Sequence, residues 1–194
     1  MILPIVAYGD AVLRKVSVEI NSDYAALPEL IENMWETMHN AKGVGLAAPQ
    51  IGKAVRLFLI DASPFEENED LDEEERNFLK NFKGVFINPE IIEEDGGEWA
   101  FSEGCLSIPN INEDVFREER IQVEYVDENF VSHKKTLNGL AARIFQHEYD
   151  HIEGILFTDK LSALKKRLLK KKLTNISKGN VDVAYRMKFP LLKK

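Results

Sequence analysis

Two segments of the chain carry apolar side chains three or four residues apart, the spacing of an amphipathic helix. The first helix is expected to begin at Leu27, with Pro28 acceptable in its opening turn, and to end at Gly43 as a glycine cap. The second is expected to begin after Asn138 as its N-cap and to end at Gly154. The apolar positions are Leu27, Leu30, Ile31, Met34, Trp35 and Met38 in the first helix and Leu140, Ala141, Ile144, Phe145 and Ile152 in the second.

Between these two helices the pattern is that of β-strands. Strand-like runs cover residues 55–60, 84–92, 120–126 and 130–136, and a further run at 99–101 leads into a glycine bend. Strands and helices do not alternate regularly, so a doubly wound sheet is disfavoured. We therefore expect an α+β fold in which antiparallel β-sheets surround the second helix, with the first helix towards the N-terminus and another helix at the C-terminus.

Length and composition indicate one domain that covers residues 1–194. The chain is 44% hydrophobic and has no internal repeat, which is typical of a domain with a sizeable core. Asp10 and Arg14 interrupt the first residues, so we expect no signal peptide, and no stretch is apolar enough to cross a membrane. The single cysteine agrees with a reducing compartment, and a cytoplasmic location is expected.

Charge is divided unevenly along the chain, which the net value of −8 hides. Residues 159–194 contain 12 lysines or arginines against 2 acids, whereas the preceding residues contain 13 against 31. An acidic insertion at about 63–83 is expected to be a solvated loop, with a short helix near 73–82 as the alternative. Residues of about 159–194 are expected to form a basic helix and tail, with the lysines of 165–172 on one face. The opposite face would carry an apolar stripe of Leu161, Leu164, Leu168 and Leu169.

The most informative stretch is His147-Glu148-Tyr149-Asp150-His151, which reads H-E-x-x-H within the second predicted helix. At about 100° per residue, His147 and His151 lie one turn apart on nearly the same face and can reach one ion. Glu148 projects about 60° from His151, within reach of a water bound to that ion. This geometry suits metal-activated hydrolysis. Histidines satisfied within the core are the alternative, which is disfavoured because burying these polar groups without a shared partner is costly.

Two histidines do not complete a metal site, and the sequence offers few third ligands. The extended pattern H-E-x-x-H-x-x-G-x-x-H fails because its last position is Phe157, which cannot ligate a metal. Glu153 points elsewhere on the helix, and Asp182 lies in the weakly patterned tail. Cys105 is the remaining candidate, in the sequence E-G-C-L-S. A lone cysteine is by default a small buried hydrophobe, but a Cys/His/His set with an open fourth position is typical of a catalytic site.

A third motif, G-V-G-L-A-A-P-Q-I-G at residues 43–52, lacks the spacing of a phosphate-binding loop. It is followed, in order, by E-G-C-L-S and by Q-H-E-Y-D-H. With these three motifs the chain resembles the peptide deformylase family from about residue 6 to about residue 161. Three motifs in one order are far more specific than any one of them alone.

The resemblance implies removal of the N-formyl group from the N-terminal formylmethionine of new polypeptides, with release of formate. In the family the metal is held by the residues that match Cys105, His147 and His151. The family's general acid and base matches Glu148, which would take a proton from the activated water and return it to the departing amine. Gln50 matches the family's glutamine beside the metal. Its side-chain amide and the backbone N–H of Leu106 would stabilise the tetrahedral oxyanion.

Substrate contacts follow partly from helix geometry and partly from the resemblance. On the second helix, Leu140 and Ile144 fall near the histidine face and would wall the pocket for the methionine side chain. Arg143 shares that side, and we expect its stem to pack while its head reaches solvent or an acid. The resemblance implies that backbone groups of Val44 and Gly45 pair with the peptide.

The resemblance also implies an ion pair and a cofactor. Glu103 and Arg117 match positions that pair in relatives and would steady the cysteine loop, with two surface charges as the alternative. The cofactor is expected to be one divalent metal ion. A Cys/His/His site admits zinc, iron, nickel or cobalt, and only the resemblance favours Fe(II).

Two rival functions and one partner question stay open at this point. A zinc peptidase would share the helix and the glutamate but need a different third ligand, and a non-catalytic binding module with a structural metal would need a fourth protein ligand. The implied partners are N-formyl-Met nascent peptides, with no membrane. The basic C-terminal helix either contacts ribosomal RNA, because basic faces favour polyphosphates, or docks by its leucines and leaves its lysines in water.

Overall fold

The structure, a computed structural model that describes residues 1–192, is built around a five-stranded antiparallel sheet. Each neighbouring pair of strands in this sheet runs antiparallel. In sheet order the strands are β2 (Gly45–Ala47), β3 (Leu57–Asp61), β4 (Lys83–Cys105), β5 (Ile108–Val126) and β6 (Ser132–Asn138). The predicted α+β class with an antiparallel sheet is therefore confirmed.

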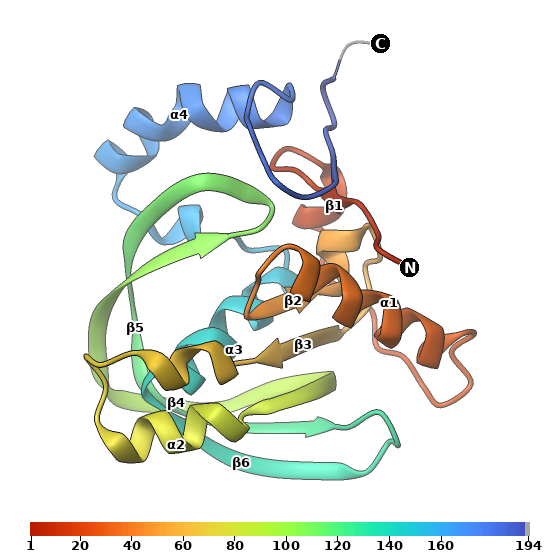
Figure 1. Cartoon of the computed structure of the whole chain (residues 1–194), viewed down its shortest axis with the longest axis vertical. Helices are drawn as coiled ribbons and strands as arrows, with labels where there is room; N and C mark the ends of the chain where they lie inside the picture. The colour runs from red at the N-terminus through yellow and green to blue at the C-terminus, as the bar shows by residue number, and fades with distance from the viewer. Residues whose placement is uncertain (193–194) are drawn as a thin grey trace.

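Within residues 1–192, four α-helices pack around this sheet (Figure 1). They are α1 (Leu27–Asn40), α2 (Glu73–Asn81), α3 (Gly139–Ile152) and α4 (Ala163–Ser177). Short 3-10 helices cover Ala11–Arg14, Ala48–Ile51, Ser63–Glu67 and Phe157–Lys160. Helix α3 carries the H-E-x-x-H motif and runs through the middle of the molecule (Figure 1). Phe145 of α3 packs edge-on against Phe58 and Phe86 of the sheet, which joins helix and sheet in one hydrophobic core.

Helix α1 begins where the pattern predicts, with a proline in its first turn, but ends differently. The left-handed residue after the helix is Lys42, with φ of 55°, and the N–H of Gly43 bonds to the carbonyl of Met38. Gly43 is therefore needed for a different reason from the one we expected. A Cβ at this position would lie 2.7 Å from the side chain of Leu106, so the glycine permits a close approach of the two loops.

The acidic segment at 63–83 follows the alternative that we gave, a short helix near 73–82, although most of its acidic side chains are exposed. Most of it is helical, and Leu79 of α2 is fully buried in the same core as α3. The carboxylate of Glu75 accepts a hydrogen bond of 2.9 Å from the backbone N–H of Leu140, in the first turn of α3. Asn138 precedes α3 as predicted, but its side chain makes no capping bond. Helix α2 thus supplies the cap that the sequence pattern assigned to Asn138.

Strands β4 and β5 form one long hairpin, which ends in the two-residue turn Leu106–Ser107 because Cys105 pairs with Ile108. The register shifts between Glu103 and Cys105, as in a β-bulge. Bulges bend a strand and re-aim its side chains. One residue of β4, Gly104, lies here opposite four residues of β5, 109–112, so the predicted glycine bend faces a bulge whose extra residues belong to β5.

Helix α4 docks through its second half, where Leu169, Leu173 and Ile176 are buried. Leu164 and Leu168 are 67% and 69% exposed, so the predicted apolar stripe is wrong at these two positions. The helix is buried mainly along its later turns, while Lys165 in its first turn pairs with Glu113 of β5. None of the helices in residues 1–192 is both long and apolar enough to cross a membrane.

The two ends of the chain meet in a small parallel sheet that the sequence pattern does not predict. Strand β1 (Ile5–Val6) pairs with β7 (Met187–Lys188), beside α4 at the top of Figure 1.

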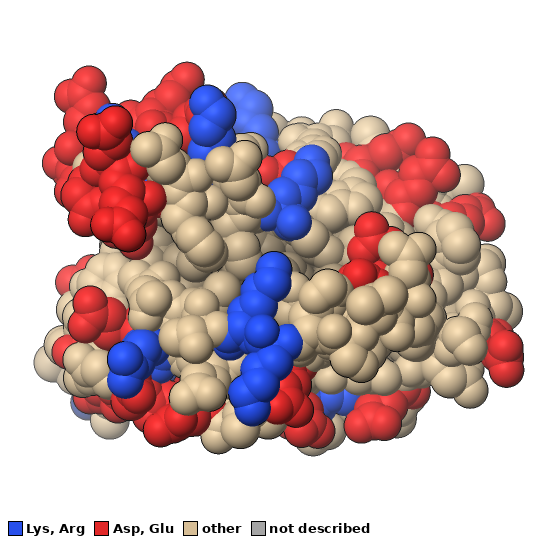
Figure 2. Space-filling model, turned by 90° about the horizontal axis from the view of Figure 1, so that it is seen from below, with Lys and Arg blue, Asp and Glu red and all other residues tan. Residues whose placement is uncertain are grey.

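Figure 2 shows the molecule from below, the end away from α4. Acidic side chains gather at its left, on the side where α2 lies in Figure 1. The acidic and basic segments of the chain therefore lie towards opposite ends of the structure.

Candidate metal centre

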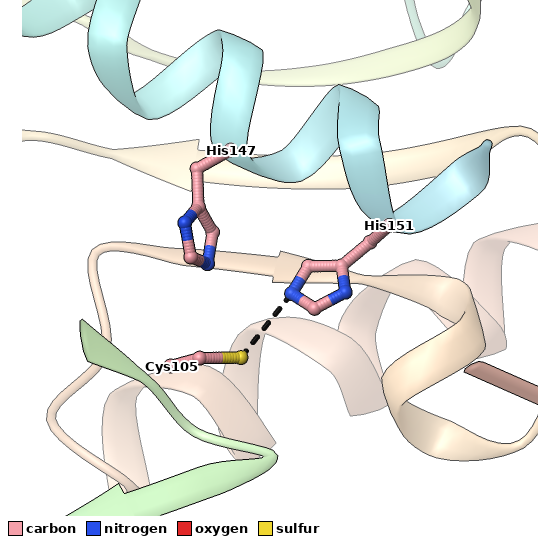
Figure 3. Close-up of side chains that lie close together, drawn as sticks. All are labelled: Cys105, His147 and His151. Carbon is pink, nitrogen blue, oxygen red and sulfur yellow. Dashed lines mark hydrogen bonds between the residues drawn. The ribbon is translucent and has the colours of Figure 1, made fainter. Parts of the chain in front are cut away.

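Three side chains meet where the turn after β4 approaches α3. His147 and His151 project from successive turns of α3, and Cys105 is the last residue of β4 (Figure 3). The ligand atoms that these three residues offer all lie within 4.8 Å of one another. The Sγ atom of Cys105 lies 3.3 Å from Nε2 of His151. The structure thus brings together the three residues that we expected to hold a metal.

The carboxylate of Glu103 is buried beside His147 and surrounded by positive groups. Arg117 donates two hydrogen bonds to it, at 2.6 and 2.9 Å, and Arg143 donates one at 3.0 Å. The Nδ1 atom of His147 lies 2.9 Å from Oε2 of Glu103. Burial disfavours the charged form, but the hydrogen bonds from Arg117 and His147 outweigh it and hold the pKa of Glu103 well below its usual range. A charged Glu103 orients the His147 ring and leaves Nε2 free for a ligand.

The expected pair of Glu103 and Arg117 is therefore a buried ion pair, and two surface charges are excluded. Arg117 also donates a hydrogen bond of 2.7 Å to Asp150. The head of Arg143 reaches an acid, one of the two outcomes that we expected, and donates further bonds to two backbone carbonyls. Asp150 was not singled out from the sequence. The signal for it was a carboxylate inside an apolar helical motif, which is costly to bury without a partner.

Glu148 has a very different environment. Its carboxylate is buried and lines a cavity, and its Oε2 atom has no hydrogen-bond partner within residues 1–192. Burial raises the pKa of Glu148 to about 7, while the charge of His147 opposes this rise and that of Glu103 adds to it. Gly45 approaches so closely that a Cβ there would lie 2.2 Å from Oε1. A buried carboxylate oxygen without a partner is rare in proteins and calls for an explanation, such as a catalytic role or a bound ion.

The side chain of Gln50 is buried next to the cluster. Its hydrogen bonds determine which end of the amide faces the cluster. Its Oε1 atom accepts a hydrogen bond of 2.8 Å from the backbone N–H of Ala47. Its Nε2 atom lies 3.5 Å from Sγ of Cys105 and 3.4 Å from Oγ of Ser107. The donor end of the amide therefore points at the cluster.

These groups line a cavity of about 530 Å³. Its wall includes Val44, Gly45 and Ile144, which are three of the four residues that we expected to bind substrate. Leu140 does not line the cavity. It is 1% exposed within the core, because it lies in the first turn of α3, well before the motif. Residues 182–185 also line the cavity, and sequence periodicity is too weak in this tail to reveal them.

The donor set fits a metal ion that accepts both sulfur and nitrogen. One thiolate and two imidazoles suit zinc and the later first-row metals, and three protein ligands leave a position open for substrate. Burial, together with the charge of His147, lowers the pKa of His151 and favours the neutral form that ligates metals. Burial also opposes the charge on His147, but its hydrogen bonds with Cys105 and Glu103 outweigh this and raise its pKa, so this ring must release a proton when a metal binds. The fold and the site together define a class: a hydrolase with a Cys/His/His metal site beside a buried glutamate.

Comparison with known proteins places the chain in one family of this class. The family model for polypeptide deformylase matches residues 2–167. The peptide deformylase of Christiangramia forsetii is 64% identical over 100% of this chain and 99% of its own length. The solved peptide deformylase of Legionella pneumophila is 37% identical with a TM-score of 0.76, over 93% of this chain and 98% of its own. Peptide deformylase 1B of Arabidopsis thaliana, solved with an inhibitor, is 30% identical with a TM-score of 0.77, over 95% of this chain and 98% of its own.

The chain belongs to the peptide deformylase family. It is a hydrolase that removes the N-formyl group from nascent polypeptides. The resemblance drawn from the three sequence motifs is confirmed.

Proposed function

We propose that deformylation takes place at the cluster of Cys105, His147 and His151, which holds one divalent metal ion, with Glu148 as the proton carrier. The observation that carries this proposal is the carboxylate of Glu148, which is buried beside the cluster, lines the cavity and keeps one oxygen unpaired within residues 1–192. The ion, when bound, supplies a Lewis acid that activates water and polarises the formyl carbonyl. Fe(II) is the ion that the family resemblance favours, and the donor set also accepts zinc, nickel or cobalt.

Glu148 transfers one proton in each turnover. A carboxyl group whose pKa is about 7 can both accept and release a proton near neutral pH. Glu148 takes a proton from water as the water oxygen bonds to the formyl carbon. It then gives that proton to the amine nitrogen as the C–N bond breaks. The products are formate and a polypeptide with a free amino terminus.

Gln50 and Leu106 act as donors to the oxyanion that develops on the formyl oxygen. The carbonyl end of the Gln50 amide is held by Ala47, so its Nε2 is aimed at the cluster before substrate arrives. Leu106 offers its backbone N–H from the turn next to Cys105. Donors that are fixed in advance stabilise developing charge without reorganisation, which is why such groups lower the barrier.

The peptide binds along β2. This strand lies at the edge of the five-stranded sheet, so one side of its backbone is available for an added strand. Val44, just before β2, and Gly45, its first residue, line the cavity next to Glu148. Backbone pairing of this kind accepts many downstream sequences, while Ile144 supplies apolar wall for the methionine side chain.

Release of formate from N-formyl-Met peptides tests this proposal, with protein loaded anaerobically with one metal at a time. We expect turnover that disappears when a chelator removes the ion and returns when the ion is restored. A Cys105→Ala variant should lose both metal and activity. If this variant keeps both metal and activity, a zinc peptidase is the better interpretation. If a fourth protein ligand holds the metal and no formate is released, a non-catalytic binding module is favoured.

We further propose that the basic side of α4 contacts ribosomal RNA in the cytoplasm, close to where the substrate emerges. Lysines and arginines at 166, 167, 170, 171 and 172 are exposed, and Leu164 and Leu168 project beside them. Such a surface binds polyphosphates in a salt-dependent way. The chain would act as one catalytic domain, because residues 182–185, beyond α4, line the cavity.

Co-sedimentation with ribosomes at low and high salt tests the RNA contact. A triple reversal, Arg167→Glu with Lys170→Glu and Lys171→Glu, should abolish sedimentation. A control with the same change in net charge, Lys15→Glu with Lys53→Glu and Lys135→Glu, should leave it intact. Equal sedimentation of the two variants would contradict the contact and favour a helix that only docks by its leucines.

A further inference from the structure

The C-terminal segment after α4 returns to the active site. Residues 182–185 line the cavity together with the cluster. They lie outside residues 2–167, which the family model matches. Part of the cavity wall is therefore built by a segment that the shared family pattern does not contain.

This segment is attached on both sides of Tyr185. Before it, the side-chain amide of Asn110 donates a hydrogen bond of 3.0 Å to the carbonyl of Asp182. After it, β7 pairs with β1, and the N–H of Ile5 bonds to the carbonyl of Arg186 at 2.9 Å. Tyr185 is thus held at the cavity by backbone contacts that do not depend on its own side chain.

The hydroxyl of Tyr185 donates a hydrogen bond of 2.8 Å to the backbone carbonyl of Leu106. Burial and the nearby Cys105 raise the pKa of Tyr185 well above its usual value, so the hydroxyl keeps its proton and remains a donor. The next carbonyl of the same turn, that of Ser107, accepts a bond of 2.8 Å from the N–H of Tyr8. Both carbonyls of the two-residue turn are therefore held by segments from the two ends of the chain.

We propose that Tyr185 is a positioning residue for deformylation: its hydroxyl fixes the turn at Leu106–Ser107 so that the Leu106 N–H points at the developing oxyanion. The proposal rests on the oxyanion role proposed above for Leu106. The side chain of Leu106 packs beside Gly43 and against the neighbouring core, and its backbone carbonyl is held by the hydroxyl of Tyr185. The hydrogen bond from Tyr185 restricts rotation of the Leu106 backbone. Donor groups lose much of their effect when they are displaced from the position of the developing charge.

The test compares Tyr185→Phe with Tyr24→Phe in the full-length, metal-loaded protein. Both tyrosines are partly buried against the same hydrophobic cluster, and each variant loses one hydroxyl. Tyr24 does not line the cavity. We expect Tyr185→Phe to lower kcat for formate release by about two- to tenfold, the effect of one hydrogen bond, with KM unchanged. Tyr24→Phe should change neither value.

A second readout is independent of the reaction. In zinc-loaded, isotope-labelled protein, the NMR order parameter of the Leu106 amide should fall in Tyr185→Phe and stay at the wild-type value in Tyr24→Phe. Equal kcat and equal order parameters in the two variants would overturn the proposal. A raised KM with unchanged kcat would also overturn it, since Tyr185 would then be only a part of the cavity wall. If the wild type releases no formate, the proposed function fails, while the order parameter still reports whether Tyr185 holds the turn.

Discussion

Two buried glutamates near His147 have opposite surroundings. Glu103 is 5% exposed and accepts hydrogen bonds from Arg117 and Arg143, and its pKa is held well below the usual range. Glu148 is 4% exposed, has one oxygen without a partner within residues 1–192, and has a pKa raised to about 7. Equal burial of the same side chain therefore leads to opposite shifts, because only one of the two carboxylates receives cationic donors.

This difference divides two tasks between two residues. A carboxylate that stays charged can hold the ring of His147 and, through it, a metal ligand. A carboxyl group that titrates near neutral pH can carry a proton. The division arises in tertiary structure, since Arg117 comes from β5 and Arg143 from α3, and both converge on Glu103 in β4.

Replacing the proton carrier should have the largest effect. Glu148→Gln keeps the size of the side chain but cannot accept the proton, so we expect formate release to fall by about 10²- to 10⁴-fold. Metal content should stay at the wild-type level, as measured by elemental analysis of the same samples. Unchanged turnover in this variant would rule out Glu148 as the proton carrier.

Moving the proton carrier without replacing it should have the next largest effect. In Gly45→Ala the added Cβ would lie 2.2 Å from Oε1 of Glu148 and must displace it. A displacement of about 1 Å can cost about 10²-fold in rate, so we expect a loss of that order in kcat. Gly84→Ala, in β4 of the same sheet, is the matched control, because its nearest contact would be an ordinary 3.6 Å to Phe86. Similar kcat values for both variants would show that the position of Glu148 is not critical.

Replacing Glu103, the carboxylate that stays charged, should weaken metal binding. Glu103→Gln removes the acceptor that orients His147, and we expect metal affinity to fall by about 10- to 100-fold, as is typical for partners of metal-ligating histidines. Competition with a chelator measures this affinity. Glu113→Gln, which changes a carboxylate paired with Lys165 near the surface, is the control. Equal metal affinities in the two variants would show that Glu103 does not contribute to metal binding.

Replacing a third glutamate, Glu75, should have the smallest effect. Glu75 extends the comparison to a glutamate that has no role at the metal. Glu75→Ala removes the cap that α2 provides to α3, and such caps contribute about 1 kcal/mol to the free energy of unfolding. Urea denaturation should detect this loss, while turnover stays unchanged. Glu74→Ala, at an exposed neighbouring position, should leave stability unchanged. A Glu75→Ala variant as stable as Glu74→Ala would contradict the capping role.

The sequence predicts those features that local spacing determines. Helical periodicity predicts α1 and α3, and the spacing of His147 and His151 within one helix places both imidazoles together. Cys105 was the third ligand left after the other candidates were set aside, and the order of the three motifs then supported it. These are patterns that a single sequence contains within short windows.

The features that the sequence did not predict depend on contacts between distant segments. The cap from Glu75 to α3 spans 65 residues, and the bond from Tyr185 to Leu106 spans 79. No periodicity marks either partner. The exposed Leu164 and Leu168 show the converse, since an amphipathic pattern indicates an apolar face but not how much of the helix will be covered.

The most direct test of the division between the two glutamates is formate release per bound metal ion, measured side by side in Glu148→Gln and Glu103→Gln at saturating metal. We predict that Glu148→Gln binds metal as the wild type does and stays inactive per ion. We predict that Glu103→Gln needs more metal to become saturated but then approaches wild-type turnover per ion. The same loss per ion in both variants, or weak metal binding in both, would contradict the division.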